Sequence, residues 1–224
     1  MHVGPFLRRL QASRSYGFVL LLVLVTLGFV AAAPEEPWAG AVLVLLLVLT
    51  LGVALWTSAT SRLDLAATCL AVVGAVGAIL ELLTTNENAT GLLGLLDVLL
   101  IAATCGVIVF GIADQHGVNF QSVLGALCIY LLIGLLYTFT YGAIAAFQSG
   151  PFFAQGTDGT ASIRLYFSVV SLATVGYGDY TAATDLGRTV AGSEGLLGQV
   201  YLVTVVAVIV SRLRPSRGAR TNEQ

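Results

Sequence analysis

Long apolar stretches separated by short polar segments dominate this chain. About 20 apolar residues are needed to cross the hydrocarbon core of a bilayer as a helix. Six stretches meet or approach that length, and we expect each to form a transmembrane helix. They are Tyr16 to Ala33, Trp38 to Thr57, Leu65 to Leu83, Gly91 to Ala113, Gln121 to Phe147 and Gly187 to Ser211.

A seventh apolar stretch, Ser162 to Ala173, is too short to span a bilayer. It fits a re-entrant helix, which is tolerated at membrane depth where protein surrounds it and the following backbone lines a watery path. The carboxyl end of such a helix points the negative pole of its dipole toward the middle of the membrane. The pattern therefore predicts a place that favours a cation.

The composition supports a membrane protein. Hydrophobic residues make up 57% of the chain and charged residues 10%, and the mean hydropathy is +0.92. A soluble domain of this composition would aggregate, so lipid is the expected solvent. The net charge of −2 and the lack of a long arginine run speak against a nucleic-acid partner. The three cysteines, Cys69, Cys105 and Cys128, lie within apolar spans and are expected to be small packing residues.

The basic residues are all arginines, and their distribution predicts the orientation. With a cytoplasmic N-terminus, most of them fall on the inner side and only Arg164 and Arg188 fall outside, as the positive-inside rule requires. The inner arginines are Arg8, Arg9, Arg14, Arg62, Arg212, Arg214, Arg217 and Arg220. Those near the two termini either bind anionic lipid heads or only anchor the topology. We favour an uncleaved first helix over a removed signal peptide, because Pro34 directly follows the small residues Ala31 to Ala33.

The stretch Thr174-Val175-Gly176-Tyr177-Gly178-Asp179 follows the re-entrant segment. Gly176 and Gly178 lack a Cβ and tolerate positive φ, so successive carbonyls can point the same way instead of alternating as in a strand. The carbonyls of Thr174, Val175, Gly176 and Tyr177, with the Thr174 hydroxyl, could then replace the water shell of a potassium ion.

This stretch resembles the selectivity filter of the tetrameric potassium-channel superfamily, and the resemblance extends from Arg164 through the last helix. The resemblance implies a homotetramer in which each subunit donates one filter strand. The implied fold is an all-α membrane protein with six transmembrane helices, a re-entrant pore helix and a filter loop. We expect a cytoplasmic amphipathic N-terminus (residues 1–15), a four-helix bundle (16–113), a pore domain (114–211) and a basic cytoplasmic tail (212–224).

The resemblance also suggests residues that support the filter. Tyr166 and Phe167 occupy positions where the family places aromatic side chains that brace the filter tyrosine, and core packing is the simpler role for both. Phe167 cannot donate a hydrogen bond to the filter aspartate as a tryptophan in many voltage-gated relatives does. Asp179 is therefore expected to find another donor, or water. Val170 stands where some bacterial relatives carry a buried glutamate, and Glu194 is a candidate to replace that missing acid.

Two residues of the last helix have alternative roles. The spacing from Leu186-Gly187-Arg188 to Gly198 resembles the family spacing from the outer mouth to the hinge glycine of the inner helix. Gly198 is therefore either a gating hinge or a glycine that permits close helix packing, and Gly192 and Gly195 lie on the same helix. Gln199 either faces the central cavity and its water or bonds a neighbouring helix.

The fourth span, Gly91 to Ala113, contains neither arginine nor lysine. Moving charge through the membrane field yields about 2.3 kcal/mol per charge per 100 mV, so we do not expect steep voltage gating. The first four helices are interpreted as a sensor-like bundle without gating charges. Two acids, Glu81 and Asp97, lie in this bundle. They are either a proton or ion sensor or structural acids, and we favour the structural role, in which they are protonated or hydrogen-bonded to neighbouring helices.

These features predict a potassium-selective channel of the cell membrane that conducts passively and is not steeply voltage-gated. A broader cation channel and a non-conducting scaffold or regulatory subunit that retains the pore fold are the alternatives. An enzyme is not expected, because no nucleophile, metal or phosphate-binding set is present. No cofactor is expected, and potassium is the permeant ligand.

Overall fold

The computed structural model describes residues 16–34, 36–58, 64–83, 87–114 and 120–213. The predicted N-terminal segment 1–15, the tail from residue 214 and the side chains of Glu81 and Arg212 lie outside the described residues.

The predicted all-α fold class is confirmed. Helices coincide with the expected apolar stretches, and the described residues contain no strand, only isolated bridges from Phe153 to Thr157 and Ala182. The helices are α2 (Tyr16–Ala32), α3 (Pro37–Ser58), α4 (Asp64–Leu83), α5 (Glu87–Ala113), α6 (Phe120–Phe147), α7 (Ala161–Leu172) and α8 (Asp185–Leu213). Among the described residues, three segments are long and apolar enough to cross a membrane: Trp38–Ser58, Leu93–Ala113 and Phe120–Phe147.

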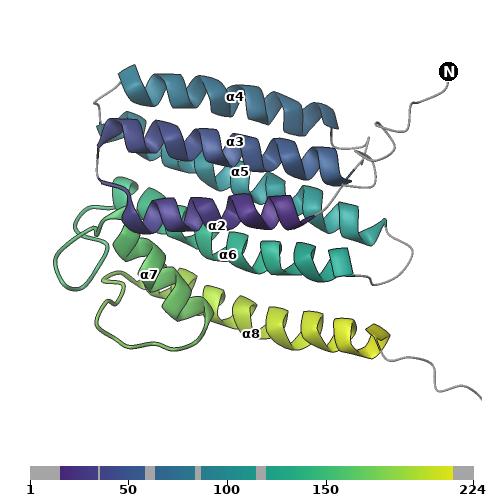
Figure 1. Cartoon of the computed structure of the whole chain (residues 1–224). Helices are drawn as coiled ribbons and strands as arrows, with labels where there is room; N and C mark the ends of the chain where they lie inside the picture. Colours follow the sequence, from purple (N-terminus) through teal and green to yellow (C-terminus); the bar gives the residue numbers. More distant parts are fainter. Residues whose placement is uncertain (1–15, 35, 59–63, 84–86, 115–119, 214–224) are drawn as a thin grey trace, which may run out of the picture.

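The long helices lie side by side, with α4 at one edge of the molecule and α8 at the other (Figure 1). Helix α6 packs against α5 and α2 and also against α7 and α8. It therefore joins the bundle of α2 to α5 to the segment from α6 to α8, which we call the pore half. Helix α2 begins on the side of the molecule where α8 ends, and the loops around α7 lie on the opposite side (Figure 1). This arrangement places the filter sequence at one end of the helix layer.

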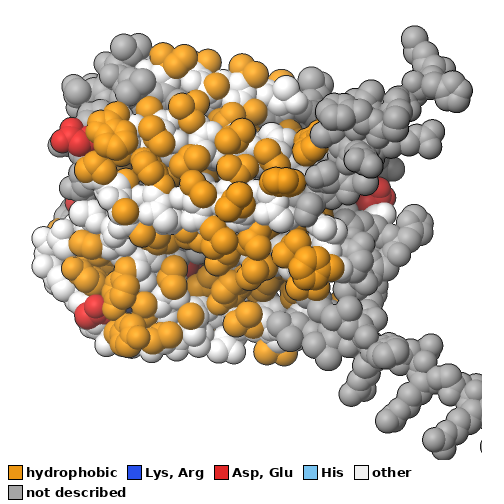
Figure 2. All heavy atoms as spheres, viewed as in Figure 1, with side chains coloured by type: hydrophobic (Ala, Val, Ile, Leu, Met, Phe, Trp, Pro, Cys, Tyr) orange, Lys and Arg blue, Asp and Glu red, His pale blue; other side chains and the backbone are white. Residues whose placement is uncertain are grey.

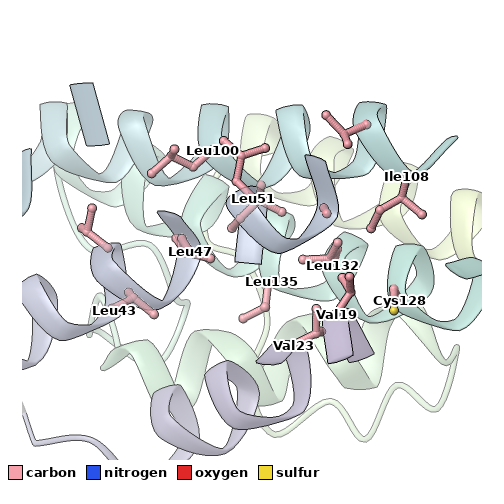
Figure 3. Close-up of a cluster of buried hydrophobic side chains, with 14 of the residues drawn as sticks. Val19, Val23, Leu43, Leu47, Leu51, Leu100, Ile108, Cys128, Leu132 and Leu135 are labelled. Carbon is pink, nitrogen blue, oxygen red and sulfur yellow. The ribbon is translucent and has the colours of Figure 1, made fainter. Parts of the chain in front are cut away.

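Aliphatic side chains fill the space between α2, α3, α5 and α6. Figure 3 shows part of this cluster, including Val23, Leu47, Leu100, Leu132 and Leu135, which are at most 2% exposed. The face seen in Figure 2 is apolar as well, because hydrophobic side chains are spread across it and acidic ones show mainly near its ends. A surface of this kind suits lipid rather than water.

Asp97 is buried in α5, with 4% of its surface exposed. It lines a cavity of about 290 Å³ between the bundle and the pore half, and Arg164 of α7 lines the same cavity. The Thr104 hydroxyl of the same helix donates to the carbonyl of Leu100, 2.7 Å away. Asp97 therefore lies where the two halves meet, at a cavity that Arg164 also lines.

Candidate functional site

The short helix α7 is defined at both ends by its own sequence. Thr160 is the N-cap residue, and its hydroxyl accepts a hydrogen bond of 3.1 Å from the backbone N–H of Ile163. Arg164 in the first turns donates to the carbonyl of Gly159 at 2.6 Å. The helix ends at Leu172, where Ala173 donates its N–H to the carbonyl of Val169. The chain then enters the filter sequence directly from the negative end of the helix dipole.

The backbone of the filter alternates between positive and negative φ. Thr174, Gly176 and Gly178 have φ values of 56°, 58° and 78°, and they are separated by residues with negative φ. The N–H groups of Thr174 and Val175 turn back to α7, where they donate to the carbonyls of Ser171 and Val170 at 2.9 Å each. This alternation is the geometry that turns successive carbonyls to one side of the chain.

The filter carbonyls are available to a ligand. All six residues from Thr174 to Asp179 are exposed in the single chain. Among the residues that the structure describes, none donates a hydrogen bond to the carbonyls of Thr174 through Gly178. A row of backbone oxygens without protein donors is a set of ligands suited to a hard, weakly hydrated cation.

The outer end of the filter is held by side chains. The Tyr166 hydroxyl donates to Asp179 Oδ2 at 2.8 Å, and the Tyr166 ring lies parallel to that of Tyr177 with centroids 6.4 Å apart. Gln155 donates its amide to the Asp179 carbonyl at 2.7 Å. The donor that Asp179 is expected to find in place of Phe167 is Tyr166. Residues adjacent on a helix point about 100° apart, so Tyr166 faces the filter while Phe167 does not.

Phe167 lies in a buried aromatic cluster. Its ring centroid is 5.1 Å from that of Tyr141 and 5.3 Å from that of Phe153, and Phe152 completes the group. The loop that carries Phe152 and Phe153 pairs with the segment after the filter through backbone bonds from Ala154 to Thr181 and from Ala183 to Phe152. The sequence reasoning missed this loop, although the adjacent phenylalanines in an otherwise polar segment were a visible signal.

Glu194 is fully buried on α8. Its carboxyl accepts from the Tyr141 hydroxyl of α6 and lies 2.5 Å from the Ser168 hydroxyl of α7. Ser168 is also 2.7 Å from the carbonyl of Gly134, and it has only one proton to donate. All these bonds form without conflict when Glu194 keeps its proton and donates to Ser168, which then donates to Gly134. The acid thus joins three helices and reaches the pore helix behind the filter.

Val170, the position compared with a buried glutamate, is half-buried, and its carbonyl accepts the N–H groups of Val175 and Gly176 at 2.9 and 3.4 Å. Val170 therefore holds the start of the filter through its backbone carbonyl rather than through its side chain. The side chain of Glu194 reaches Ser168, two residues before Val170 on the same helix.

The glycines of α8 have different surroundings. A Cβ added at Gly198 would lie 2.3 Å from the carbonyl oxygen of Leu172, whereas one added at Gly192 would meet nothing within 4 Å. Gly198 thus lets α8 approach the end of α7 closely, and this close packing requires a glycine at position 198. Gln199 follows it and donates its amide to the Thr174 hydroxyl at 3.1 Å. It contacts the filter itself, which neither alternative for this residue had anticipated.

Comparisons with known proteins agree with this site. Residues 125–214, which contain α7, the filter and α8, match a family model described as an ion channel. The chain is 36% identical over 95 residues to the Shaker-related potassium channel tsha2 of Oncorhynchus mykiss. The aligned region covers 40% of this chain and 18% of that protein. It is 30% identical over 110 residues to the inward rectifier potassium channel Kirbac3.1 of Paramagnetospirillum magnetotacticum. This aligned region covers 48% of this chain and 37% of that protein.

The chain thus matches less than two fifths of the length of either relative. No solved structure matches it at the significance that these relatives reach. The residues that match the ion-channel model, 125–214, include the segment with the filter geometry. On this evidence the chain is a membrane protein whose residues 125–214 resemble an ion channel, and part of the chain is similar to two potassium channels.

Proposed function

We propose that this protein is a potassium-selective channel that conducts ions passively down their electrochemical gradient. The observation that carries the proposal is the alternation of positive φ at Thr174, Gly176 and Gly178, together with filter carbonyls that accept no hydrogen bond from the described residues. Such carbonyls can replace the hydration shell of a potassium ion. Conduction requires that each ion bind weakly enough to leave when another enters.

The proposed assembly is a homotetramer. One chain supplies one filter strand, which surrounds an ion only when about four copies meet around an axis. The single chain exposes apolar surface where neighbours would pack: Val175 is 52% and Tyr177 70% exposed in the filter, and Leu196 and Val203 of α8 are 71% and 67% exposed. These side chains lie on the filter and the inner helix, the elements that would surround the axis.

The proposed orientation places the filter toward the outside of the cell membrane and both termini in the cytoplasm. It is supported by the arginine distribution and by the position of the α7 loops opposite the start of α2 and the end of α8 (Figure 1). Anionic lipid heads are the proposed partners of the arginines near both termini.

Steep voltage gating is not part of the proposal. Helix α5, which holds the position of a sensor helix, contains no arginine or lysine. Current recorded against voltage in symmetric potassium should therefore change gradually. A steep activation equivalent to several charges per subunit would contradict this statement while leaving the filter assignment intact.

Flux of potassium into liposomes that contain the purified protein tests the main proposal. A scaffold subunit would give no flux, and a broad cation channel would pass sodium comparably. Gly176→Ala should abolish potassium-selective flux, because an added Cβ opposes the φ of 58°.

Gly156→Ala is the matched control. Gly156 also has positive φ, at 80°, and a Cβ there meets nothing within 4 Å, but it lies in the outer loop rather than the filter. The control carries the same kind of backbone strain and should keep selective flux. Selective flux unchanged in Gly176→Ala would reject the filter assignment.

A further inference from the structure

A side chain of the inner helix contacts the innermost residue of the filter. Gln199 Nε2 donates to Thr174 Oγ1 at 3.1 Å, across 25 positions of sequence. The contact depends on Gly198, because only a residue without a side chain lets α8 come this close to the carbonyl of Leu172. Both Gln199 and Thr174 are exposed in the single chain, on the surface proposed to face the pore axis.

The hydroxyl that Gln199 contacts is a candidate ion ligand. A threonine hydroxyl has one proton and two lone pairs. When the Gln199 amide donates to one lone pair, the other remains for a cation, and the oxygen is no longer free to rotate. A ligand that is oriented before the ion arrives loses less entropy when the ion binds.

Thr174 also needs external support for its backbone. It has a φ of 56°, and it is the described non-glycine residue with positive φ. A β-branched residue rarely adopts this conformation, and it persists only where the surroundings hold it. Its N–H is held by the carbonyl of Ser171 at 2.9 Å, and its side chain is held by Gln199.

We infer that Gln199 is a positioning residue for the innermost cation site of the filter. Its amide fixes the Thr174 hydroxyl with a lone pair toward the pore axis, and in this way it sets how tightly that site holds a dehydrated cation of potassium size. The inference rests on the proposed function, since it gives a role to a residue behind the proposed filter. It assigns cation affinity at one site to the inner helix, in addition to the filter residues themselves.

Block by barium tests the inference. Ba²⁺ is close to K⁺ in size and carries twice its charge, so it should bind a site of this size and stop potassium flux. In liposomes that contain the full chain, Gln199→Leu should raise the Ba²⁺ concentration that halves the remaining potassium flux about tenfold, because the hydroxyl loses its orientation. Thr174→Ala should raise it at least as much. The combined variant should show no further increase, since both changes remove the same oriented hydroxyl.

Thr204→Val is the matched control on the same helix. The Thr204 hydroxyl donates to the carbonyl of Val200, four residues earlier in its own helix, so its loss should leave Ba²⁺ block unchanged. If Gln199→Leu does not assemble, Gln199→Asn shortens the side chain by one methylene, keeps it polar and should produce the same shift.

The outcomes separate the two proposals. A wild-type protein without potassium-selective flux would overturn both. Selective flux in the wild type, combined with unchanged Ba²⁺ block in an assembled Gln199 variant, would overturn the role of Gln199 alone. Additive shifts in the combined variant would do the same, because they would mean that Gln199 acts apart from the Thr174 hydroxyl.

Discussion

Hydroxyls that donate to the carbonyl four residues earlier occur in both halves of this protein, for example at Thr50 and Thr138, but most of the side-chain bonds between elements lie in the pore half. In the bundle, the hydroxyls of Thr26, Thr50 and Thr104 each donate to the carbonyl four residues earlier in the same helix. In the pore half, Glu194 and Gln199 bond to residues of other elements. The first kind satisfies a polar group without fixing any neighbour, and the second fixes one element against another.

This difference shows how each half is held together. Apolar packing in the bundle is not directional, so similar side chains can replace one another at modest cost. Hydrogen bonds between elements are directional and fix a particular geometry. Cross-element bonds also occur at the start of α2, where the Tyr16 N–H donates to Gln121 Oε1 at 2.8 Å and ties the bundle to α6. Such contacts are more frequent in the pore half, where they fix α7 and the segment after it against α6 and α8.

The largest expected effect is at Gly198. Gly198→Ala would place a Cβ 2.3 Å from the Leu172 carbonyl oxygen, a backbone atom that cannot move aside cheaply. We expect loss of the folded assembly, measured by size-exclusion chromatography and thermal unfolding in detergent. Gly192→Ala, in open space on the same helix, should assemble and gain up to about 1 kcal/mol of helix propensity. An assembled Gly198→Ala channel with altered opening would instead favour the hinge role.

The next largest effect is expected at Glu194. Glu194→Ala leaves the buried Tyr141 hydroxyl without its acceptor and opens a cavity, so we expect a loss of about 3 kcal/mol in the free energy of unfolding. Glu194→Gln should stay within about 1 kcal/mol of the wild type, because an amide can accept from Tyr141 and donate to Ser168 as a protonated acid does. Thermal unfolding in detergent measures both. A glutamine variant as unstable as the alanine variant would contradict the protonated carboxyl.

A smaller effect is expected at Tyr166. Tyr166→Phe keeps the ring beside Tyr177 but removes the donor to Asp179. Because Gln155 still holds the Asp179 carbonyl, we expect folding to be unchanged and the ratio of potassium to sodium flux to fall by less than about tenfold. Tyr180→Phe is the control, since its ring packs on Phe153 and Tyr166 without a part in the bond to Asp179. An equal fall in both variants would show that ring packing, rather than the hydrogen bond, maintains the filter.

The smallest effect is expected in the bundle. Thr50→Val removes a hydroxyl that donates to Leu46, whose carbonyl keeps its helical N–H partner, so the free energy of unfolding should change by about 0.6 kcal/mol or less. Ser168→Ala makes a similar change in the pore half but leaves Glu194 without a partner there, and it should be clearly more destabilising. Equal effects in thermal unfolding would remove the contrast between the two halves.

The helices could be predicted from the sequence because membrane depth requires long apolar runs, and the boundaries agree within a few residues. The re-entrant segment expected at Ser162 to Ala173 is observed as α7, from Ala161 to Leu172. The start of α5 differs more, since the helix begins at Glu87 rather than Gly91. Polar residues in the first turn of that helix carry no hydropathy signal, so the apolar run alone placed its start too late.

The filter sequence by itself determined which residues could offer carbonyls to a cation, because Gly176 and Gly178 readily adopt positive φ, whereas the positive φ of Thr174 is visible only in the structure. Only the tertiary structure decided what holds them. Donation from Tyr166 to Asp179, the burial of Glu194 against Tyr141 and Ser168, and the contact of Gln199 with Thr174 join positions 13 to 53 residues apart. Local pattern specifies an element and its apolar face, but the direction and reach of a polar side chain depend on how helices distant in sequence approach one another.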